Sequence, residues 1–266
     1  MFFKPVCRGA ASLILVASWL AGCASAPAGP AVSTTPAISK TTPISPTNTN
    51  PSTVPHDSPP SPFELSNYAF PDAIDPAKQY LFYLHGKIVE DQGIPAISPD
   101  YGEYQYGAIL EAFGSYGFQV ISEQRPKDTD GVKYASRVSQ QVAALLNAGV
   151  PAGNITVVGA SRGAGITIYV SHYLEEEINY VLLAICHPDR VASLVQGGIS
   201  LHGNVLSIYD SVDEYAGSCQ ELFAFSEGKG ISRHDEIVLE IGTGHGVLYQ
   251  PLDEWIIPVV EWAGKP

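Results

Sequence analysis

The sequence has few positive charges. Its 266 residues include 14 Lys and Arg against 27 Asp and Glu, which gives a formal net charge of -13 at pH 7. Basic residues form no cluster along the chain. Because neutralising phosphates requires clustered Lys and Arg, this composition argues against nucleic acid as a partner.

Cysteines and long apolar runs are also scarce. The chain has 4 Cys, too few for a disulfide scaffold at this length, and no CxxC spacing of the kind that binds zinc. No apolar run reaches the roughly 18 residues of a membrane span. Hydrophobic residues nevertheless make up 45% of the chain and charged residues only 15%, so the composition predicts a globular protein with a sizeable core.

The first 22 residues have the anatomy of a secretory signal. Lys4 and Arg8 provide its positive region, and the apolar stretch 10–20 that follows is too short to span a bilayer. Residues 20–23 read Leu-Ala-Gly-Cys and resemble a bacterial lipobox. In such signals the peptidase cuts before the Cys, which is then acylated. An ordinary secretory signal, cut after residue 26, is the alternative.

The lipobox resemblance implies a membrane anchor. Several acyl chains on Cys23 would hold the chain stably at a bilayer, where one would not. Ala24 follows the Cys, which by resemblance to Gram-negative lipoproteins fits the outer membrane. We therefore expect localisation in the bacterial cell envelope, with the membrane as a partner through the lipid and the domain on the periplasmic or extracellular side.

A low-complexity segment separates this signal from the rest of the chain. Residues 24–62 contain 10 of the 21 prolines, and Pro, Ser and Thr together make up 24 of these 39 residues. Such a composition buries little and favours an extended or disordered segment. We interpret 23–62 as the acylated Cys with a tether, although a tail without a role would have the same composition.

The remaining residues, 63–266, alternate short apolar runs with amphipathic stretches. This pattern is typical of one α/β domain with a parallel sheet and crossover helices. We predict strands over residues 79–84, 118–122, 155–158, 180–185, 205–209 and 236–241, and helices over 103–116, 133–147, 164–174 and 253–262.

A GxSxG motif follows one predicted strand. Gly159-Ala160-Ser161-Arg162-Gly163 lies between the apolar strand at 155–158 and the helix at 164–174. A sharp strand-to-helix turn would lift the Ser161 hydroxyl out of the sheet, and the flanking glycines would let strand and helix approach. We interpret Ser161 as a nucleophile; a structural serine in a glycine-rich turn is the alternative.

A serine nucleophile needs a base. His245 lies in a loop with three glycines directly after the last predicted strand, which suits an imidazole directed at a site. A solvated surface histidine is the alternative. The other histidines lack this position, and His85 belongs to a separate motif; they are His56, His85, His172, His187, His202 and His234.

The imidazole needs an acid to fix its tautomer. Both Asp210 and Asp213 follow the predicted strand at 205–209. The order of serine, acid and histidine resembles that of the α/β-hydrolase superfamily, whose pattern places the acid in a turn a few residues beyond this strand; the resemblance thus favours Asp213, with Asp210 as the alternative. Both could also merely cap the turn.

The order Ser161, Asp213, His245 resembles that of the α/β-hydrolase superfamily, over essentially all of 63–266. A His-Gly pair at residues 85–86, after the first predicted strand, adds to the resemblance. The family implies a mostly parallel sheet with helices on both faces. It also implies an oxyanion hole formed by the backbone N–H groups of Lys87 and Arg162, with His85 itself in a structural role.

Two departures from the family pattern bear on the site. Only about 20 residues separate the predicted strands at 180–185 and 205–209, where many family members insert a cap. We therefore expect a minimal, capless version with an open site, which argues against a true lipase. The chain also lacks the first two strands of larger members.

These features predict a serine hydrolase that cleaves an ester, or a thioester or amide, through an acyl-enzyme. A carboxylesterase acting on small polar esters comes first, and a peptidase or acyltransferase is a less favoured alternative. No metal or organic cofactor is required. A catalytically silent binding lipoprotein with the same fold is the competing hypothesis, but it would not require Ser, Asp and His in family order. A lipoprotein whose role lies in its anchor alone is a weaker one.

Charged and aromatic residues collect at the predicted carboxyl edge of the sheet, where ligands bind in such folds. The charged ones are Lys87, Glu90, Glu123 and Arg125, and the aromatic ones are Tyr101, Tyr104 and Tyr106. We expect Glu90, Glu123 and Arg125 to orient a polar or charged substrate. Mutual ion pairs, and packing for the tyrosines, are the alternatives.

The cysteines lead to one further expectation. Cys7 leaves with the signal and Cys23 is acylated, so Cys186 and Cys219 remain as an even pair in an exported protein. We predict a disulfide between them that clamps the acid loop. Two buried free thiols are the alternative.

Overall fold

The computed structural model describes residues 63–264. The predicted signal, the Pro/Ser/Thr-rich segment, Cys23 and His56 lie outside the described residues. No helix within 63–264 combines the length and the apolar character needed to cross a membrane.

Six parallel strands form the central sheet. Their order is β4-β1-β5-β6-β7-β8, and every neighbouring pair is parallel. The strands are β1 (Tyr80–Leu84), β4 (Gln119–Ile121), β5 (Ile155–Ala160), β6 (Asn179–Leu183), β7 (Gly203–Asp210) and β8 (Ile231–Leu239).

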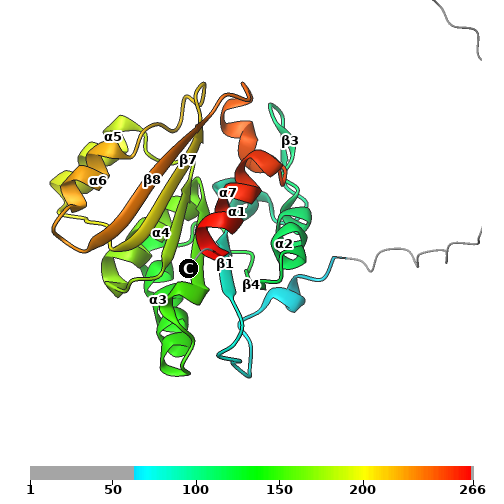
Figure 1. The fold of residues 1–266 in the computed structure, drawn as a ribbon. Coiled ribbons are helices and arrows are strands. Elements are labelled where there is room, and N and C mark those ends of the chain that lie inside the picture. The colour runs from blue at the N-terminus through cyan, green and yellow to red at the C-terminus, as the bar shows by residue number, and fades with distance from the viewer. Residues whose placement is uncertain (1–62, 265–266) are drawn as a thin grey trace, which may run out of the picture. The chain divides into compact units, whose positions relative to one another are not determined.

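Helices cover both faces of this sheet (Figure 1). One face carries α3 (Gly131–Asn147), α4 (Arg162–Leu174), α5 (Pro188–Gln196) and α6 (Gln220–Ser226). The other carries α1 (Lys87–Gln92), α2 (Tyr106–Ser115) and α7 (Asp253–Gly264). The remaining elements are a small antiparallel pair, β2 (Ile97–Ser98) and β3 (Gly102–Glu103), and three 3-10 helices, η1 (Leu65–Tyr68), η2 (Ala152–Asn154) and η3 (Gly244–Tyr249).

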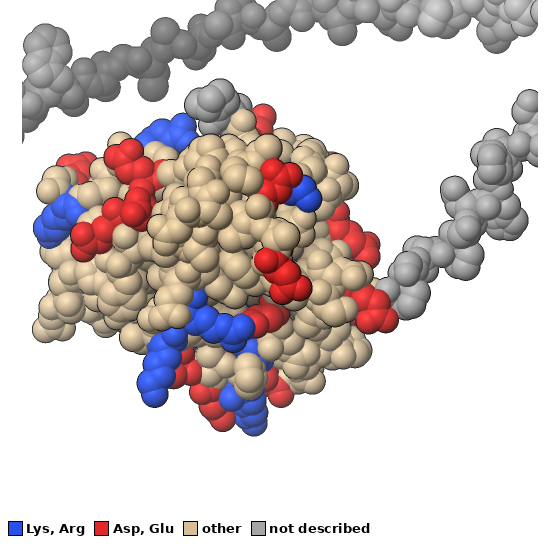
Figure 2. Space-filling view, turned by 90° about the horizontal axis from the view of Figure 1, so that it is seen from below, with Lys and Arg blue, Asp and Glu red and all other residues tan. Residues whose placement is uncertain are grey.

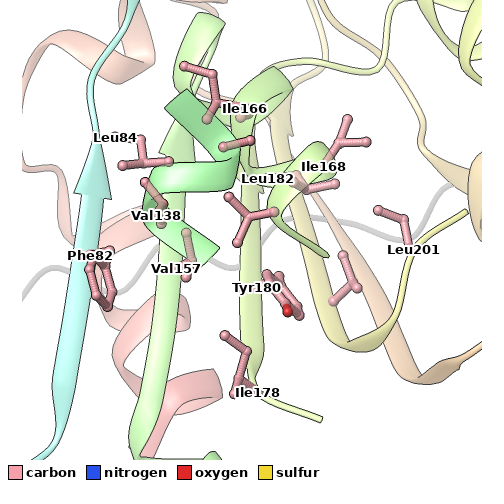
Figure 3. Close-up of a cluster of buried hydrophobic side chains, with 14 of the residues drawn as sticks. Phe82, Leu84, Val138, Val157, Ile166, Ile168, Ile178, Tyr180, Leu182 and Leu201 are labelled. Atoms are coloured by element: carbon pink, nitrogen blue, oxygen red, sulfur yellow. The ribbon is translucent and has the colours of Figure 1, made fainter. Parts of the chain in front are cut away.

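The strands supply side chains to two hydrophobic cores because successive residues of a strand point to opposite faces. In β1, Phe82 and Leu84 pack toward α3 and α4, and Leu81 and Tyr83 pack toward α2 and α7. Figure 3 shows the first of these cores, where Phe82 and Leu84 of β1 lie beside Val157 of β5. Burial on both faces explains why the central strands are continuous apolar runs.

The chain reverses its direction of travel across the sheet between β1 and β5. After β1 it crosses to the edge strand β4, and then returns to place β5 on the other side of β1. The register pairs Leu84 with Gly159, so β1 and β5 end side by side. Ligands of such folds bind outside the carboxyl ends of the strands at this switch point.

The described residues form a minimal α/β fold, with a parallel central sheet between two layers of helices as the sequence predicts. The sheet begins at β4, whose outer edge is covered where the Ser122 N–H donates to the Tyr68 carbonyl at 2.8 Å. A single helix, α5, connects β6 to β7, so no cap domain is inserted at this place.

Several predicted boundaries are wrong, for local reasons. Helix α2 begins at Tyr106, later than predicted, because Gly102 and Glu103 pair with β2. Strand β8 begins at Ile231, five residues before the predicted start, and its early residues are half-exposed or exposed, so no apolar run marks them. Helices α1, α5 and α6 were not predicted at all, since they are short and take their stability from packing on the sheet.

Figure 2 shows the molecule from the end of the sheet at which the strands begin, opposite to their carboxyl ends. Lys and Arg side chains gather toward one edge of this face, beside Asp and Glu, and most of the visible surface carries neither charge. Positive and negative charges are therefore interleaved on this face.

Candidate active site

Ser161 occupies a strained turn between β5 and α4. Its φ of 50° and ψ of -111° lie in a region that L residues rarely adopt. The Ser161 N–H donates to the Leu183 carbonyl of β6 at 2.8 Å, which fixes the turn against the neighbouring strand. The turn places the hydroxyl at the carboxyl end of β5.

The two glycines of the motif are required by close backbone contacts. A Cβ on Gly159 would lie 2.5 Å from the Ala164 nitrogen, and a Cβ on Gly163 would overlap the Leu84 backbone at the end of β1. Real side chains do not approach this closely, so only glycine lets α4 start directly above β1 and β5.

His245 joins Ser161 to an acid. Its Nε2 lies 2.9 Å from the Ser161 Oγ, and its Nδ1 lies 2.8 Å from Oδ2 of Asp213. A neutral imidazole with its proton on Nδ1 donates to the carboxylate and leaves Nε2 free to accept the serine proton. The Asp213 side chain is fully buried, and its Oδ1 accepts a hydrogen bond from the Tyr215 N–H at 2.8 Å.

The structure separates the two acids that the sequence left as alternatives. Asp213 faces His245, whereas Asp210 is buried and faces backbone N–H groups. Asp210 accepts from Val212 at 3.1 Å and from Gly242 at 2.9 Å. Asp210 therefore ties the loop that carries the acid to the loop that carries the histidine.

Two helix N-termini converge on Ser161. Lys87 and Arg162 are the first residues of α1 and α4, and the N–H of a first helical residue has no partner within its helix. Gly86 lies close to the serine, since a Cβ at this position would be 3.9 Å from the Ser161 Cβ. The turn after β1 and the start of α4 thus bring the first residues of both helices close to the nucleophile.

The interpretation of Glu90 and Arg125 as substrate ligands is wrong, because both side chains are buried. Arg125 Nε lies 2.7 Å from Glu90 Oε1, and the side chains are 0% and 1% exposed. Arg125 also donates from Nη2 to the His85 carbonyl, and its N–H donates to His85 Nε2 at 2.9 Å. The pair therefore supports the turn after β1 from beneath and does not face the cleft.

The prediction that Glu123 orients the substrate is also wrong. Its carboxylate accepts from Arg137 at 2.7 Å and borders a cavity of about 350 Å³ between β1, α3 and η1. Ser161 does not line this cavity. Glu123 consequently lies apart from the nucleophile.

His85 has a structural environment. Its ring is fully buried, and burial together with the charge of Arg125 lowers its pKa from the usual 6.5 to about 3. The ring is therefore neutral at neutral pH and accepts the Arg125 N–H through Nε2.

A cleft of about 1010 Å³ opens beside the Ser161 hydroxyl. Ser161 and His245 line it together with residues that the sequence analysis did not single out, notably Ile185, Arg190 and Tyr215. Tyr215 is 65% exposed, and its ring stands edge-on to His245 at 5.5 Å between centroids. Pro188, at the first turn of α5, is the one sequence signal that could have indicated this helix at the cleft.

The three tyrosines after α1 have different positions. Tyr101 borders a second hollow of about 230 Å³ beside His245. Tyr104 and Tyr106 are buried, and their hydroxyls contact the hydroxyls of Tyr83 at 2.6 Å and Ser122 at 2.5 Å. Only Tyr101 thus lies near the histidine.

A disulfide lies behind the acid loop. Cys186, after β6, and Cys219, before α6, are bonded with their Cα atoms 5.1 Å apart. The Cys219 N–H also donates to Glu236 Oε2 of β8 at 2.6 Å. The segment that carries Asp213 is therefore held between β6 and β8.

No group of three or more His, Cys, Asp or Glu side chains within residues 63–264 could hold a metal ion. Of the histidines in this part of the chain, only His245 lies within hydrogen-bond distance of Ser161.

No protein-family model and no curated protein matches the sequence. Solved structures that resemble the chain include SOBER1 from Arabidopsis thaliana, with 13% identity, coverage of 71% of this chain and 100% of the other, and a TM-score of 0.47. A predicted CIB-like hydrolase from Thermoplasma acidophilum has 15% identity, coverage of 73% and 90%, and a TM-score of 0.48. A putative dienelactone hydrolase from Klebsiella pneumoniae has 10% identity, coverage of 74% and 90%, and a TM-score of 0.49. Likenesses at this level say nothing of the reaction or substrate of this chain.

Proposed function

We propose that the protein is a serine hydrolase that cleaves an ester through an acyl-enzyme, with Ser161 as nucleophile, His245 as base and acid, and Asp213 as the residue that orients His245. One observation carries this proposal. The Asp213–His245–Ser161 chain has contacts of 2.8 and 2.9 Å, in an arrangement that can remove a proton from a serine hydroxyl.

In the first half-reaction, the Ser161 Oγ attacks the ester carbonyl carbon while His245 Nε2 takes the serine proton. The resulting imidazolium is stabilised by the Asp213 carboxylate on Nδ1. Collapse of the tetrahedral intermediate breaks the bond to the alkoxy oxygen, which leaves as an alcohol with the proton from His245. The acyl group stays on Ser161.

The tetrahedral oxygen needs donors. The N–H groups of Lys87 and Arg162 are suited to this role, because they start two helices at the serine and carry no helical partner. Removing one such donor typically costs about 2.7–4 kcal/mol of transition-state stabilisation.

In the second half-reaction, water replaces the alcohol. His245 accepts a proton from the water, whose oxygen attacks the acyl carbon. The ester bond to Ser161 then breaks, and the proton returns to the Ser161 oxygen. The products are a carboxylic acid and free enzyme, and no metal or organic cofactor enters either step.

A small ester is the substrate class that we propose. Most side chains that line the cleft beside Ser161 are polar or charged, with Ile185 and Tyr215 among the others, and a single helix, α5, borders it in place of a cap. This arrangement suits carboxylesterase activity on a small polar ester better than hydrolysis of long acyl chains.

We further propose that the reaction takes place in the bacterial cell envelope, with Cys23 as the lipid anchor. The disulfide between Cys186 and Cys219 supports export, because such bonds persist in oxidising compartments and are rare in the cytosol.

The test is hydrolysis of 4-nitrophenyl acetate by the full chain in detergent. Ser161→Ala and His245→Ala should each lower kcat by at least about 10³-fold, because each removes a member of one catalytic unit. Ser139→Ala, on α3, serves as the control, because within residues 63–264 the hydroxyl that it removes hydrogen-bonds to the Ala135 carbonyl alone. Equal activity in wild type and Ser161→Ala would refute the proposal, and a folded wild type without any hydrolase activity would favour the silent binding protein.

A further inference from the structure

Arg190 places a guanidinium in the cleft of the nucleophile. It belongs to the first turn of α5 and lines the same cleft as Ser161 and His245. Its side chain makes no hydrogen bond or ion pair with any residue of the described part of the chain, and the residue is exposed. In an acidic protein, such a cation beside a nucleophile requires an explanation.

The other two cations of the cleft are already engaged by the protein. Lys87 Nζ lies 2.8 Å from Asp91 Oδ1. Arg162 donates from Nη2 to the Thr129 carbonyl at 2.8 Å, and its Nε lies 3.8 Å from Oε1 of the buried Glu90. Arg190 is thus the one cation of this cleft whose charge and donors, judged on residues 63–264, are uncommitted.

Two carboxylates also line the cleft, at Asp189 and Glu214. Asp189 precedes Arg190 on α5, and neighbouring residues of a helix point in different directions. Its side chain is 97% exposed and lies 3.9 Å from His187 Nδ1. Neither carboxylate is within 4.0 Å of the Arg190 guanidinium, so neither neutralises it directly.

The guanidinium lies against the start of α4. A Cβ on Gly165 would be 3.6 Å from Arg190 Nη1, and the Gly165 N–H donates to the Ser161 carbonyl at 3.1 Å. Arg190 therefore reaches the first turn of the helix that begins at the nucleophile. One helical turn is about 5.4 Å along the axis, a distance that a few bonds of a small substrate can span.

We propose that the substrate carries a carboxylate a few bonds from the scissile ester, and that Arg190 binds it. The proposal rests on the proposed function of Ser161. An uncommitted guanidinium presents paired N–H donors that match the two oxygens of a carboxylate. Binding at Arg190 would hold the ester in the cleft with its carbonyl at Ser161. The natural substrate is accordingly a monoester of a dicarboxylic acid, or a hydroxy acid whose hydroxyl is acylated and whose carboxylate is free.

The experiment compares matched esters, using the full chain in detergent. On the acyl side, mono-4-nitrophenyl adipate carries the carboxylate and 4-nitrophenyl hexanoate lacks it. On the alcohol side, 4-acetoxybenzoate carries it and phenyl acetate lacks it. For each ester, kcat/KM is measured in wild type and Arg190→Gln, so that intrinsic reactivity cancels in the ratio.

Arg190→Gln should lower kcat/KM for the carboxylate ester of at least one pair by about 10- to 100-fold, chiefly through KM. The neutral ester of that pair should change by less than about 2-fold. Arg190→Lys should recover part of the loss, because it keeps the charge but not the paired donors. Lys127→Gln removes one positive charge from an exposed residue outside the cleft and should leave all four esters unchanged.

A change of equal size in the charged and neutral esters of both pairs, or no change in either, would overturn the inference about Arg190. Ser161-dependent hydrolysis of the neutral esters would then still support the proposed function. If no ester is hydrolysed in a Ser161-dependent way, the proposed function fails, and the inference about the substrate fails with it.

Discussion

Arg125 and Glu90 form an ion pair in the interior of the protein, directly beneath the turn that follows β1. The Nε–Oε1 distance is 2.7 Å, and neither side chain reaches solvent appreciably. Arg125 joins this pair to the His85 carbonyl, so it connects the loop after β4, the turn after β1 and the start of α1. A pair of this kind supports the position of the Lys87 N–H without touching a substrate.

Breaking this pair should be costly. Arg125→Met would remove the 2.7 Å partner of the buried Glu90 carboxylate and leave it the Arg162 Nε at 3.8 Å, and we expect a loss of about 3–5 kcal/mol in the free energy of unfolding. Arg125→Met combined with Glu90→Leu removes both charges and should recover part of this loss, measured by urea denaturation at pH 7. A single variant as stable as wild type, or a double variant no more stable than the single one, would contradict this role.

The two acids near His245 should respond differently to amidation. Asp213→Asn removes the charge that holds His245 in its tautomer, and kcat for ester hydrolysis should fall roughly 10⁴-fold. Asp210→Asn keeps an oxygen to accept from the Gly242 N–H and should change kcat far less. Steady-state kinetics on 4-nitrophenyl acetate distinguishes the two, and the reverse ranking would assign the acid to Asp210.

The disulfide should contribute to stability through the loop that it closes. Cys186 and Cys219 are 33 residues apart in the sequence, and closing a loop of this size stabilises the fold by about 3–4 kcal/mol in the chain-entropy description. Cys186→Ser with Cys219→Ser should lose about this amount, measured by denaturant unfolding. Reducing the wild-type protein should reproduce the loss, and reduction should not affect the double variant.

His85 should make the fold sensitive to acid. Burial lowers its folded-state pKa to about 3, below the unfolded value of 6.5, so the unfolded state binds a proton first as the pH falls. The His85 contribution is therefore complete above pH 6.5 and declines between pH 6.5 and 3, by about 2 kcal/mol at pH 5.

His85→Gln removes this titration, so its free energy of unfolding should fall less between pH 7 and pH 5 than that of wild type. Parallel pH profiles for wild type and His85→Gln would show that His85 does not titrate on unfolding.

The sequence predicts the structure best where the local pattern of apolar residues and glycines agrees with the topology of the sheet. The strand at 155–158, the glycines around Ser161 and the helix that follows define the turn, because buried parallel strands are apolar runs and the turn admits only glycine beside them. The order of Ser161, Asp213 and His245 follows from the order of the strands that carry them.

The surroundings of the nucleophile could not be predicted in the same way. A charged residue after a strand, such as Arg125, can turn inward to a partner or outward to a ligand, and only the packing of α1 decides this. Helix α5, which brings Arg190 to the cleft, is short, and its position depends on contacts with the sheet and α6.

The role of Ser161 as nucleophile is tested most directly by the reaction of the full chain with a fluorophosphonate, which phosphonylates only activated serines. Wild type and Ser161→Ala are compared by intact mass, with circular dichroism to show that both are folded. We expect one phosphonyl group on the wild type, at Ser161, and none on Ser161→Ala. An unlabelled, folded wild type, or equal labelling of both proteins, would contradict this role.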